Sequence, residues 1–416
     1  MNVVVINDYA HINGGAASVA IESALGLAST GLQVYFIAVV GPVDPRLRTH
    51  KNLKVFCSEG TDLLGDPKRW RAAIHGWWNP SEGRRLSKIL CHLDPASTII
   101  HVHGWMKAFS PAVFLWLRRL GFRVVVTLHD YFIACPNGAF LDYPRSRNCT
   151  VRALSLSCLA CNCDSRSYRQ KLWRFGRGLL QQSIFDFSST VSGYIGVSQF
   201  AMEKVDQYLP AHARRIVIRN PLLLSPDAGP AGDPHGPLLF AGRLSQEKAP
   251  LLAAAAARKL GRKIRFVGDG PLLATLRQEY PEAECLGWLP RERVLELMKS
   301  SSVLVFPSIW LETNGLVVVE ALSQGLPVVI SEGIAASEFA TDGTKGRLFR
   351  IGDVADLVTQ TENVLKGWHK MSRSAHAWYW SDPWTIERHC ETLVGWYAQI
   401  LSASAPSMQS GQDGSS

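Results

Sequence analysis

Two glutamates in the C-terminal half have the types and spacing that sugar chemistry needs. Glu312 and Glu320 stand eight positions apart, after an apolar run that ends at Phe306. We expect Glu312 in a loop and Glu320 about two turns into a helix that begins near Asn314, so that both carboxylates face one cleft. One carboxylate suits sugar hydroxyls and the other a ribose diol. A capping carboxylate and an ordinary helical Glu are the alternative, but Glu320 lies in an apolar run, where an unpaired carboxylate is costly.

Two cations precede these acids. The segment 242–248 reads Gly-Arg-Leu-Ser-Gln-Glu-Lys and places Arg243 and Lys248 between an expected strand and an expected helix. Free amides and the dipole at a helix N-terminus attract anions, and the two side chains add positive charge, which fits a diphosphate. Two solvated basic side chains are the alternative. Gly268 and Gly270 in a second turn let the backbone approach a ligand closely, although simple tight turns also contain Gly-x-Gly.

Parallel sheets covered by helices are expected to position these residues, because short β-branched runs alternate with helical patterns. The expected strands are Val3 to Ile6, Gln33 to Val40, Thr98 to Val102, Arg123 to Leu128, Tyr194 to Val197, Leu238 to Ala241, Ile264 to Val267, Val303 to Phe306 and Pro327 to Ile330. The expected helices are Gly15 to Ser29, Ser81 to Leu93 and Pro250 to Leu260, and Ser198 caps another. Pro, Gly and Asp are dense over 220–237, which predicts a linker. The α/β pattern therefore predicts two Rossmann-like, doubly wound domains that face a central cleft.

Composition agrees with a two-domain enzyme of the cytoplasm. The chain has 416 residues, of which 47% are hydrophobic and 19% charged. The N-terminus reads as a strand rather than a signal peptide, and no apolar run reaches the roughly 18 residues of a spanning helix. Net charge is +9, and Trp70, Trp77 and Trp78 lie among basic residues between Lys68 and Lys88. That region suits an anionic acceptor or peripheral contact with the anionic inner face of a membrane, or it is a solvated helix face. No motif indicates nucleic-acid binding.

Cysteines cluster in the N-terminal half, where five of the nine fall between Cys135 and Cys163. In a reducing cytoplasm this clustering favours thiolates on a metal over disulfides. The expected ligands of a structural zinc are Cys135, Cys149, Cys158 and Cys163. Their spacing fits no standard zinc finger, and free buried thiols are the alternative.

In order and spacing these motifs resemble the retaining glycosyltransferase family 4, of GT-B fold. The resemblance rests on the turns at 242–248 and 268–271 and on the Glu312 and Glu320 pair. In the N-terminal half it rests on Gly14-Gly15-Ala16-Ala17, His101-Val102-His103-Gly104-Trp105 and Thr127-Leu128-His129-Asp130-Tyr131. The cysteines look like those of a cysteine-bearing branch. The resemblance covers nearly the whole chain and is more specific in the C-terminal half.

The resemblance implies transfer of a sugar from a UDP, GDP or ADP donor to a glycan or lipid-linked acceptor, in surface polysaccharide or glycoconjugate synthesis. Arg243 and Lys248 would hold the donor diphosphate, Glu312 the donor sugar and Glu320 the ribose. His129 would reach the sugar near the transferred bond. The other donor-binding residues that it implies are Gly14, Gly15, Gly268, Leu289, Asn314, Gly315 and Leu316. Thr313, Asn314 and Ala249 depart from the family pattern, so the donor sugar is not carried over.

Composition and resemblance together divide the chain. We expect an acceptor-binding domain over 1–225, a nucleotide-sugar-binding domain over 226–375, a helix over 376–401 that returns to the N-terminal domain, and a disordered tail over 402–416. The retained configuration of the transferred sugar, which the resemblance implies, requires the acceptor to attack the face of the sugar from which the phosphate leaves. The leaving phosphate would take the acceptor's proton. The sequence has no Asp-x-Asp, so we expect chemistry that needs no metal cofactor.

Two other functions compete with an active transferase. A catalytically silent GT-B subunit would bind a nucleotide sugar and regulate a partner, but the intact Arg243, Lys248, Glu312 and Glu320 favour the active enzyme. A dinucleotide oxidoreductase would need Gly-x-Gly-x-x-Gly after the first strand, and the segment 14–17 does not supply it.

Overall fold

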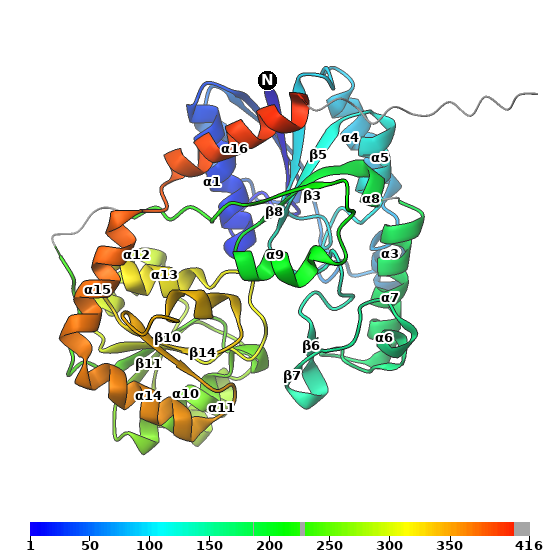
Figure 1. The fold of residues 1–416 in the computed structure, drawn as a ribbon. Coiled ribbons are helices and arrows are strands. Elements are labelled where there is room, and N and C mark those ends of the chain that lie inside the picture. The colour runs from blue at the N-terminus through cyan, green and yellow to red at the C-terminus, as the bar shows by residue number, and fades with distance from the viewer. Residues whose placement is uncertain (186, 225–228, 403–416) are drawn as a thin grey trace, which may run out of the picture.

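Two α/β halves, each built on one parallel sheet, make up the molecule (Figure 1). The computed structural model describes residues 1–185, 187–224 and 229–402. The N-terminal sheet has seven strands in the order β3-β2-β1-β4-β5-β8-β9, and the C-terminal sheet has six in the order β12-β11-β10-β13-β14-β15. In each sheet the strands follow the chain from a central strand, β1 or β10, to one edge, and the next strands are then added on the other side of that central strand. This is the doubly wound arrangement, whose ligands bind where the order reverses.

The strands of the N-terminal half are β1 (Asn2–Ile6), β2 (Gln33–Val40), β3 (Leu53–Gly60), β4 (Thr98–Val102), β5 (Arg123–Leu128), β8 (Val191–Gly196) and β9 (Arg214–Val217), with a hairpin of β6 (Leu141–Asp142) and β7 (Arg147–Asn148). Its helices are α1 (Gly15–Ser29), α2 (Pro45–Thr49), α3 (Arg69–His75), α4 (Pro80–Leu90), α5 (Val113–Arg119), η1 (Tyr143–Arg145), α6 (Leu156–Ala160), α7 (Tyr168–Ser183), α8 (Phe187–Thr190) and α9 (Gln199–Asp206). Ser198 caps α9, since its Oγ accepts from the Ala201 amide at 3.0 Å, which confirms the predicted cap.

The C-terminal half contains β10 (Leu238–Ala241), β11 (Ile264–Val267), β12 (Glu284–Gly287), β13 (Val303–Phe306), β14 (Val328–Ser331) and β15 (Gly346–Phe349). Its helices are η2 (Gln246–Lys248), α10 (Pro250–Lys259), α11 (Leu273–Glu279), α12 (Arg291–Lys299), α13 (Leu316–Ser323), η3 (Ala335–Phe339), α14 (Val354–Lys366) and α15 (Trp368–Ser381), and α16 (Ile386–Ser402) follows. None of the described helices combines the length and apolar character needed to cross a membrane.

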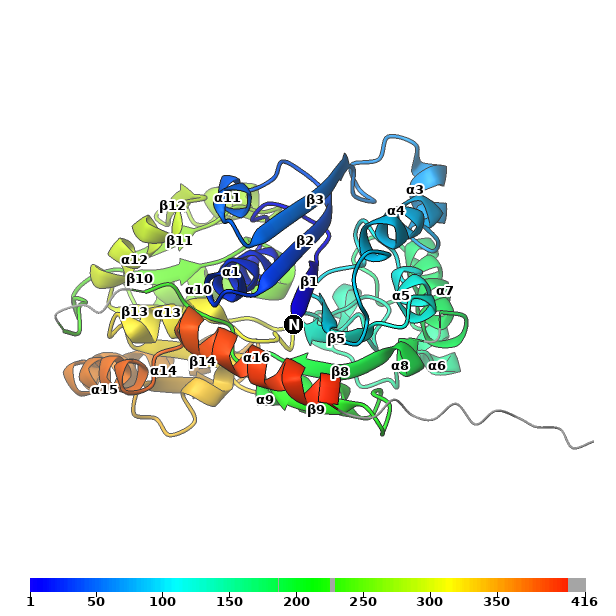
Figure 2. The same ribbon diagram turned by 90° about the horizontal axis from the view of Figure 1, so that it is seen from above.

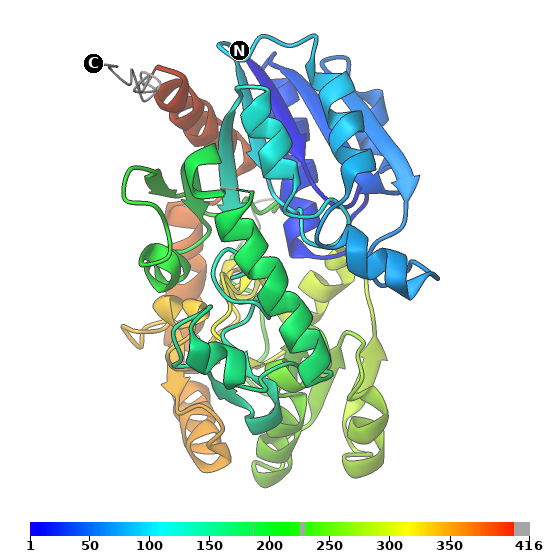
Figure 3. The same cartoon turned by 90° about the vertical axis from the view of Figure 1, so that its right-hand side faces the viewer.

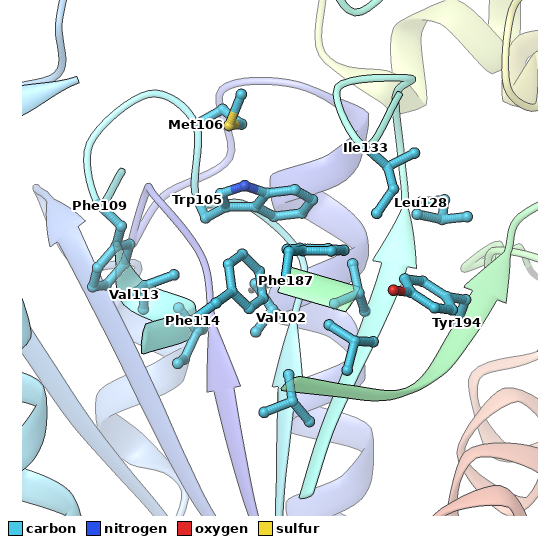
Figure 4. Packing of buried hydrophobic residues seen from close by; sticks show 14 of the residues in the cluster. Val102, Trp105, Met106, Phe109, Val113, Phe114, Leu128, Ile133, Phe187 and Tyr194 are labelled. Atoms are coloured by element: carbon cyan, nitrogen blue, oxygen red, sulfur yellow. The ribbon is translucent and has the colours of Figure 1, made fainter. Parts of the chain in front are cut away.

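Alternate side chains of each central strand enter opposite cores. In β1, Val4 and Ile6 pack on one face of the sheet and Val3 and Val5 on the other. Figure 4 shows the first core, where the Phe114 ring packs edge to face against Trp105 and Phe187. Each such large apolar side chain contributes roughly 1.5 to 3 kcal/mol by leaving water. These two cores hold the sheet rigid below the loops at its carboxyl end.

The last helix returns to the N-terminal half. Residues 376–401 were expected as one helix, but the chain breaks between α15 and α16. Pro383 lies at the break, and a proline lacks the N–H that a continuous helix would use. In Figure 2, α16 lies along the N-terminal sheet, and a Cβ on Gly26 of α1 would lie only 2.6 Å from the Cys390 sulfur.

Several element boundaries differ from the sequence prediction. α4 ends at Leu90 rather than Leu93, and α13 begins at Leu316, so Glu320 is its fifth residue rather than two turns in. Gly315 causes the late start of α13, because its left-handed φ of 82° ends the preceding loop. The edge strands β3, β9, β12 and β15 were not predicted. Residues 225–228 of the predicted linker and 403–416 of the predicted tail lie outside the described residues.

Candidate functional site

The strongest charge contact of the site joins two of the predicted residues. Lys248 at the end of η2 donates from Nζ to Glu312 Oε1, which also accepts from Ser308 Oγ at 2.8 Å. Glu312 is 5% exposed, so the lysine supplies the positive charge that a buried carboxylate needs. The Lys248 ammonium also lies 5.5 Å from the centre of the Phe306 ring. The pair is thus positioned at the carboxyl ends of β10 and β13, where a ligand is expected.

Two glycines bring the turns after β10 and β11 together. A Cβ on Gly268 would lie 2.0 Å from the Gly242 carbonyl oxygen, and one on Gly270 would lie 2.4 Å from the Leu244 oxygen. Backbone hydrogen bonds from Gly242 and Leu244 lock the two turns, at 2.9 Å each to the oxygens of Val267 and Asp269. Gly268 is therefore needed for packing of the turns, which is a structural role beside its predicted role at the donor.

The loop between β13 and α13 carries unsatisfied polar groups. Asn314 is 5% exposed, and neither its Oδ1 nor its Nδ2 has a hydrogen-bond partner among the described residues. Glu312 adopts a φ of 35°, which is uncommon for a residue with a side chain. A buried amide left unpaired and a strained backbone at one loop are features of ligand sites.

Glu320 has a partner that the sequence did not reveal. Its Oε1 accepts from Arg291 Nε at 2.8 Å, and Arg291 is the first residue of α12. Burial raises the pKa of Glu320, while the charge and hydrogen bond of Arg291 oppose that shift. One nitrogen of Arg291, Nη2, is buried without a hydrogen-bond partner among the described residues. The pair can present both an acceptor and a donor to a diol.

The remaining predicted donor residues surround this centre. Arg243 is exposed on the turn that also carries Lys248. Burial raises the pKa of Tyr143 to about 12, and the charge of the nearby Arg243 is a smaller effect in the opposite direction. Leu289 is partly buried, after Trp288, whose side chain is 76% exposed. Gly14 and Gly15 are exposed at the start of α1, and no other atom lies within 4 Å of a Cβ built on either, which leaves room for a ligand.

His129 lies in a stack of neutral histidines in the N-terminal half. Its Nε2 is 2.9 Å from His103 Nδ1, and His103 in turn stacks on His101 with ring centres 4.0 Å apart. Burial, with a smaller effect of His389, lowers the pKa of His129 to about 3. His129 is therefore uncharged at neutral pH and acts through hydrogen bonds rather than as a cation.

Hydrogen bonds join the two halves at the site. Thr313 Oγ1 donates to the His129 carbonyl at 2.9 Å, and the Tyr131 hydroxyl donates to the Glu312 carbonyl at 2.7 Å. Ser198 Oγ donates to the Thr313 carbonyl at 2.7 Å. The structure therefore brings His129, Lys248, Glu312 and Asn314 to one junction.

Two carboxylates beside His129 were missed by the sequence analysis. Asp8 and Asp130 line the same small pocket as His129. Asp8 accepts hydrogen bonds from three consecutive amides, 107–109, at 2.8 to 3.1 Å. Burial raises the pKa of Asp130 to about 6. Asp130 stood in the motif Thr127-Leu128-His129-Asp130, so its place beside His129 was the one signal that could have identified it.

The predicted zinc site is not supported. The described residues, which include all nine cysteines, contain no group of three His, Cys, Asp or Glu side chains able to hold a metal. Lys171, fully buried, donates from Nζ to Cys158 Sγ at 3.1 Å and lies near Cys135 and Cys163. Burial lowers the pKa of Lys171, but these sulfur contacts outweigh burial and raise it. An ammonium thus supplies the positive charge that zinc was expected to bring.

Family models match both halves of the chain. Residues 13–222 match the model described as Glycosyltransferase Family 4, and residues 236–367 match the one described as Glycosyl transferases group 1. The chain is 36% identical over 141 residues to Sulfoquinovosyl transferase SQD2 of Arabidopsis thaliana, a match that spans 32% of this chain and only 28% of that relative. It is 24% identical over 358 residues to an uncharacterized 42.6 kDa protein in the cps region of Klebsiella pneumoniae, spanning 79% of this chain and 84% of the relative.

Solved structures share the whole architecture. Sucrose-phosphate synthase from Thermosynechococcus elongatus superposes with a TM-score of 0.71 at 16% identity, over 97% of this chain and all of the other. Anabaena HepE in complex with UDP-glucose gives 0.65 at 16% identity, over 96% of this chain and all of the other. At these identities the likeness concerns the fold. With two parallel doubly wound sheets and a family model over half of its length, the chain belongs to glycosyltransferase family 4 and has the GT-B fold.

Proposed function

We propose that the chain transfers a sugar with retained configuration from a nucleoside-diphosphate sugar to a glycan or lipid-linked acceptor, without a metal. One observation carries the proposal: Lys248, Glu312 and the unpaired Asn314 amide meet His129 where the carboxyl ends of both sheets face each other. The donor follows the family and the UDP complexes of the similar structures. Surface polysaccharide or glycoconjugate synthesis is the role that this transfer would serve.

In the proposed reaction the bond between the sugar and the donor phosphate breaks, and negative charge develops on the diphosphate. Lys248 and Arg243 would hold that charge, and fixed cations stabilise it more in the transition state than in the ground state. The diphosphate would share the Lys248 ammonium with Glu312, whose carboxylate then faces the donor sugar. Arg291 and Glu320 would bind the ribose diol.

The acceptor hydroxyl would approach from the N-terminal half, on the face of the sugar that the phosphate leaves. His129 is neutral and can hydrogen-bond the sugar without adding charge. The leaving phosphate would take the acceptor proton, so no protein nucleophile is required. The proposal puts Gly14 and Gly15 beside the phosphate, where the free space around their Cα atoms admits it.

A thermal-shift series with UDP-glucose, GDP-mannose and ADP-glucose tests the proposal. A bound donor at about 100 times its dissociation constant adds about 3 kcal/mol of stability. The series is repeated with EDTA, which should leave both binding and transfer unchanged, and the configuration of the product is determined by NMR. Binding without transfer would support the silent subunit, which the comparisons do not favour. Loss of transfer in EDTA, or an inverted product, would overturn the corresponding part of the proposal.

A further inference from the structure

A second cavity in the N-terminal half opens from the candidate site. Its volume is about 320 Å³, in the range of small-ligand pockets. It shares Tyr9, Met106, Lys107 and Phe132 with the small pocket that contains His129, so the two spaces adjoin. All residues that line the cavity belong to the N-terminal half. The cavity therefore lies beside the candidate site and is built without the proposed donor residues.

Positive charge dominates the cavity wall. Its five cations are Arg69, Lys107, Arg166, Arg174 and Arg177, and its one carboxylate is Asp62. Arg174 is paired with Asp164 behind the wall at 3.2 Å, which leaves the other cations in excess. Asp62 is already occupied, because its two oxygens accept from the Tyr9 hydroxyl and from the Gly65 amide, both at 2.6 Å. A wall with this excess of positive charge favours an anion that carries more than one negative charge.

Arg177 gives independent evidence of a ligand. It is only 3% exposed, and its Nε has no hydrogen-bond partner among the described residues, although Nη1 donates to the Met106 carbonyl at 2.9 Å. Burial first, and then Arg174, lower the pKa of Arg177 to about 9, so it remains charged at neutral pH. The charges of Asp8 and Asp130 offset this burial only in part, so the free N–H in the cavity wall is a position for a further anionic group.

An apolar groove of about 500 Å³ continues from this cavity to the surface. The two spaces share Ala73 and Trp173. The other groove residues are Ile74, Trp77, Trp78, Leu180, Ile184 and Phe185. Ile74 and Ile184 are 56% and 59% exposed, and large apolar side chains exposed in one groove indicate a binding surface. A groove with this lining fits a hydrocarbon chain rather than a sugar.

The groove has fixed walls, because α3 and α7 are locked together (Figure 3). The indoles of Trp77 and Trp173 stack with ring centres 6.4 Å apart. Trp173 Nε1 donates to the Ala73 carbonyl at 3.1 Å, and Trp77 Nε1 donates to the Trp173 carbonyl at 3.2 Å. A Cβ on Gly76 would lie 2.5 Å from the Trp173 ring, so the glycine permits this contact.

We propose that the cavity and the groove bind the acceptor as a phosphate-bearing lipid that stays in its membrane. The phosphate binds the cations, the chain follows the groove of α3 and α7 into the bilayer, and the acceptor hydroxyl reaches the pocket of His129. This inference rests on the proposed function. A water-soluble glycan would need polar groups where the groove has apolar ones. A second copy of this chain could cover the groove, but it would leave Arg177 without an anion.

Co-sedimentation with vesicles tests the inference on the full chain. We expect the protein to bind vesicles of equal parts phosphatidylcholine and phosphatidic acid, and not vesicles of phosphatidylcholine alone. Arg166→Glu in the cavity and Ile184→Glu in the groove should each weaken binding about tenfold or more. The matched controls are Lys370→Glu and Leu156→Glu, which make the same changes at exposed positions outside both spaces and should keep binding.

Four outcomes overturn the inference. They are equal binding to both kinds of vesicle, no binding to either, controls that lose as much as the test variants, and a dimer that is broken by Ile184→Glu while vesicles are not bound. Competition with inorganic phosphate shows whether the lipid chain contributes to binding beside the phosphate. Partial displacement of the protein from vesicles supports a lipid ligand. Full displacement at a low phosphate concentration indicates a soluble phosphate ligand instead. Donor binding is measured in parallel. If the protein binds vesicles but no donor, the proposed function is contradicted and this inference is not. If it binds a donor but no vesicles, this inference is contradicted and the proposed function is not.

Discussion

The two halves of the molecule handle positive charge in opposite ways. At the C-terminal site each buried acid has a cation of its own, with Lys248 on Glu312 and Arg291 on Glu320. The N-terminal cavity is lined by five cations and one carboxylate, and of the five only Arg174 has an ion pair with a buried acid, Asp164, among the described residues. Paired charges keep their geometry without a ligand, whereas an excess of one sign is stable only when an anion arrives. If the proposed functions hold, the donor side is formed before binding and the acceptor side is completed by its substrate.

Removal of Lys248 tests the C-terminal site, where each acid is paired with a cation, and we expect it to have the largest effect on transfer. Lys248→Ala should lower kcat/KM for transfer by about 10² to 10³-fold, since one fixed positive group at a developing charge contributes about that much. It also leaves the buried Glu312 carboxylate unpaired, which lowers the melting temperature. Initial rates and thermal denaturation measure the two effects.

A double variant separates them. Lys248→Ala with Glu312→Gln removes the unpaired charge, so its melting temperature should recover while transfer stays low. Lys370→Ala, an exposed lysine of the same half, is the control. Unchanged turnover in Lys248→Ala would contradict the phosphate role.

The turns that hold the paired side leave no room for a side chain. Gly268→Ala places a Cβ against the Gly242 oxygen and forces a φ of 132° on alanine, so we expect a loss of about 3 kcal/mol or more in urea unfolding. Gly261→Ala is the matched control, because Gly261 has a φ of 62° but no atom within 4 Å of a built Cβ. It should lose only about 1 kcal/mol. Equal losses in both variants would mean that the close approach of the turns is not what Gly268 provides.

Sequence patterns found the middle of each sheet and missed all four edges. β1, β4, β5 and β13 are buried runs of Val, Ile and Leu, and such runs identify central strands. The edge strands have solvent on one side: β3 has the burial pattern Beiiieee, and β9 begins with two arginines. Without a regular apolar run, an edge strand is recognised only from its neighbour in space.

The site divides in the same way. Lys248 stands in the motif after β10, and Glu312 and Asn314 stand in the motif after β13, so their place at the carboxyl ends of two central strands could be predicted. Arg291 and Arg177 lie on helices without a motif, and only the fold brings them to Glu320 and to the cavity. The predicted zinc site is not confirmed, and cysteine spacing alone does not show that Lys171 enters the cluster from α7.

Asp130 tests the charge balance of the N-terminal side, where burial outweighs the opposing charges of Lys107 and Arg177. The folded carboxyl holds its proton up to a pKa of about 6, against 3.8 unfolded, so folding takes up a proton between these values. The stability of the wild type therefore falls as pH rises through this window. Asp130→Asn stays neutral and should gain up to about 3 kcal/mol over the wild type between about pH 4 and pH 7, in urea unfolding. A difference that does not change with pH would show that Asp130 is ionised when folded.

The smallest effect concerns the backbone next to Lys248. Ala249 has a φ of 48° and a ψ of 51°, a left-handed conformation that costs alanine about 1 to 2 kcal/mol and glycine almost nothing. Glycine recovers that strain but loses about 0.5 to 1 kcal/mol through the greater entropy of its unfolded chain, so Ala249→Gly should gain about 0.5 kcal/mol. Urea unfolding measures the gain, and donor KM is followed beside it. If stability rises while KM also rises, the strained alanine fixes the position of Lys248, and the paired side depends on backbone strain as well as on charge. If neither changes, the Lys248 and Glu312 contact alone is sufficient to hold the donor site.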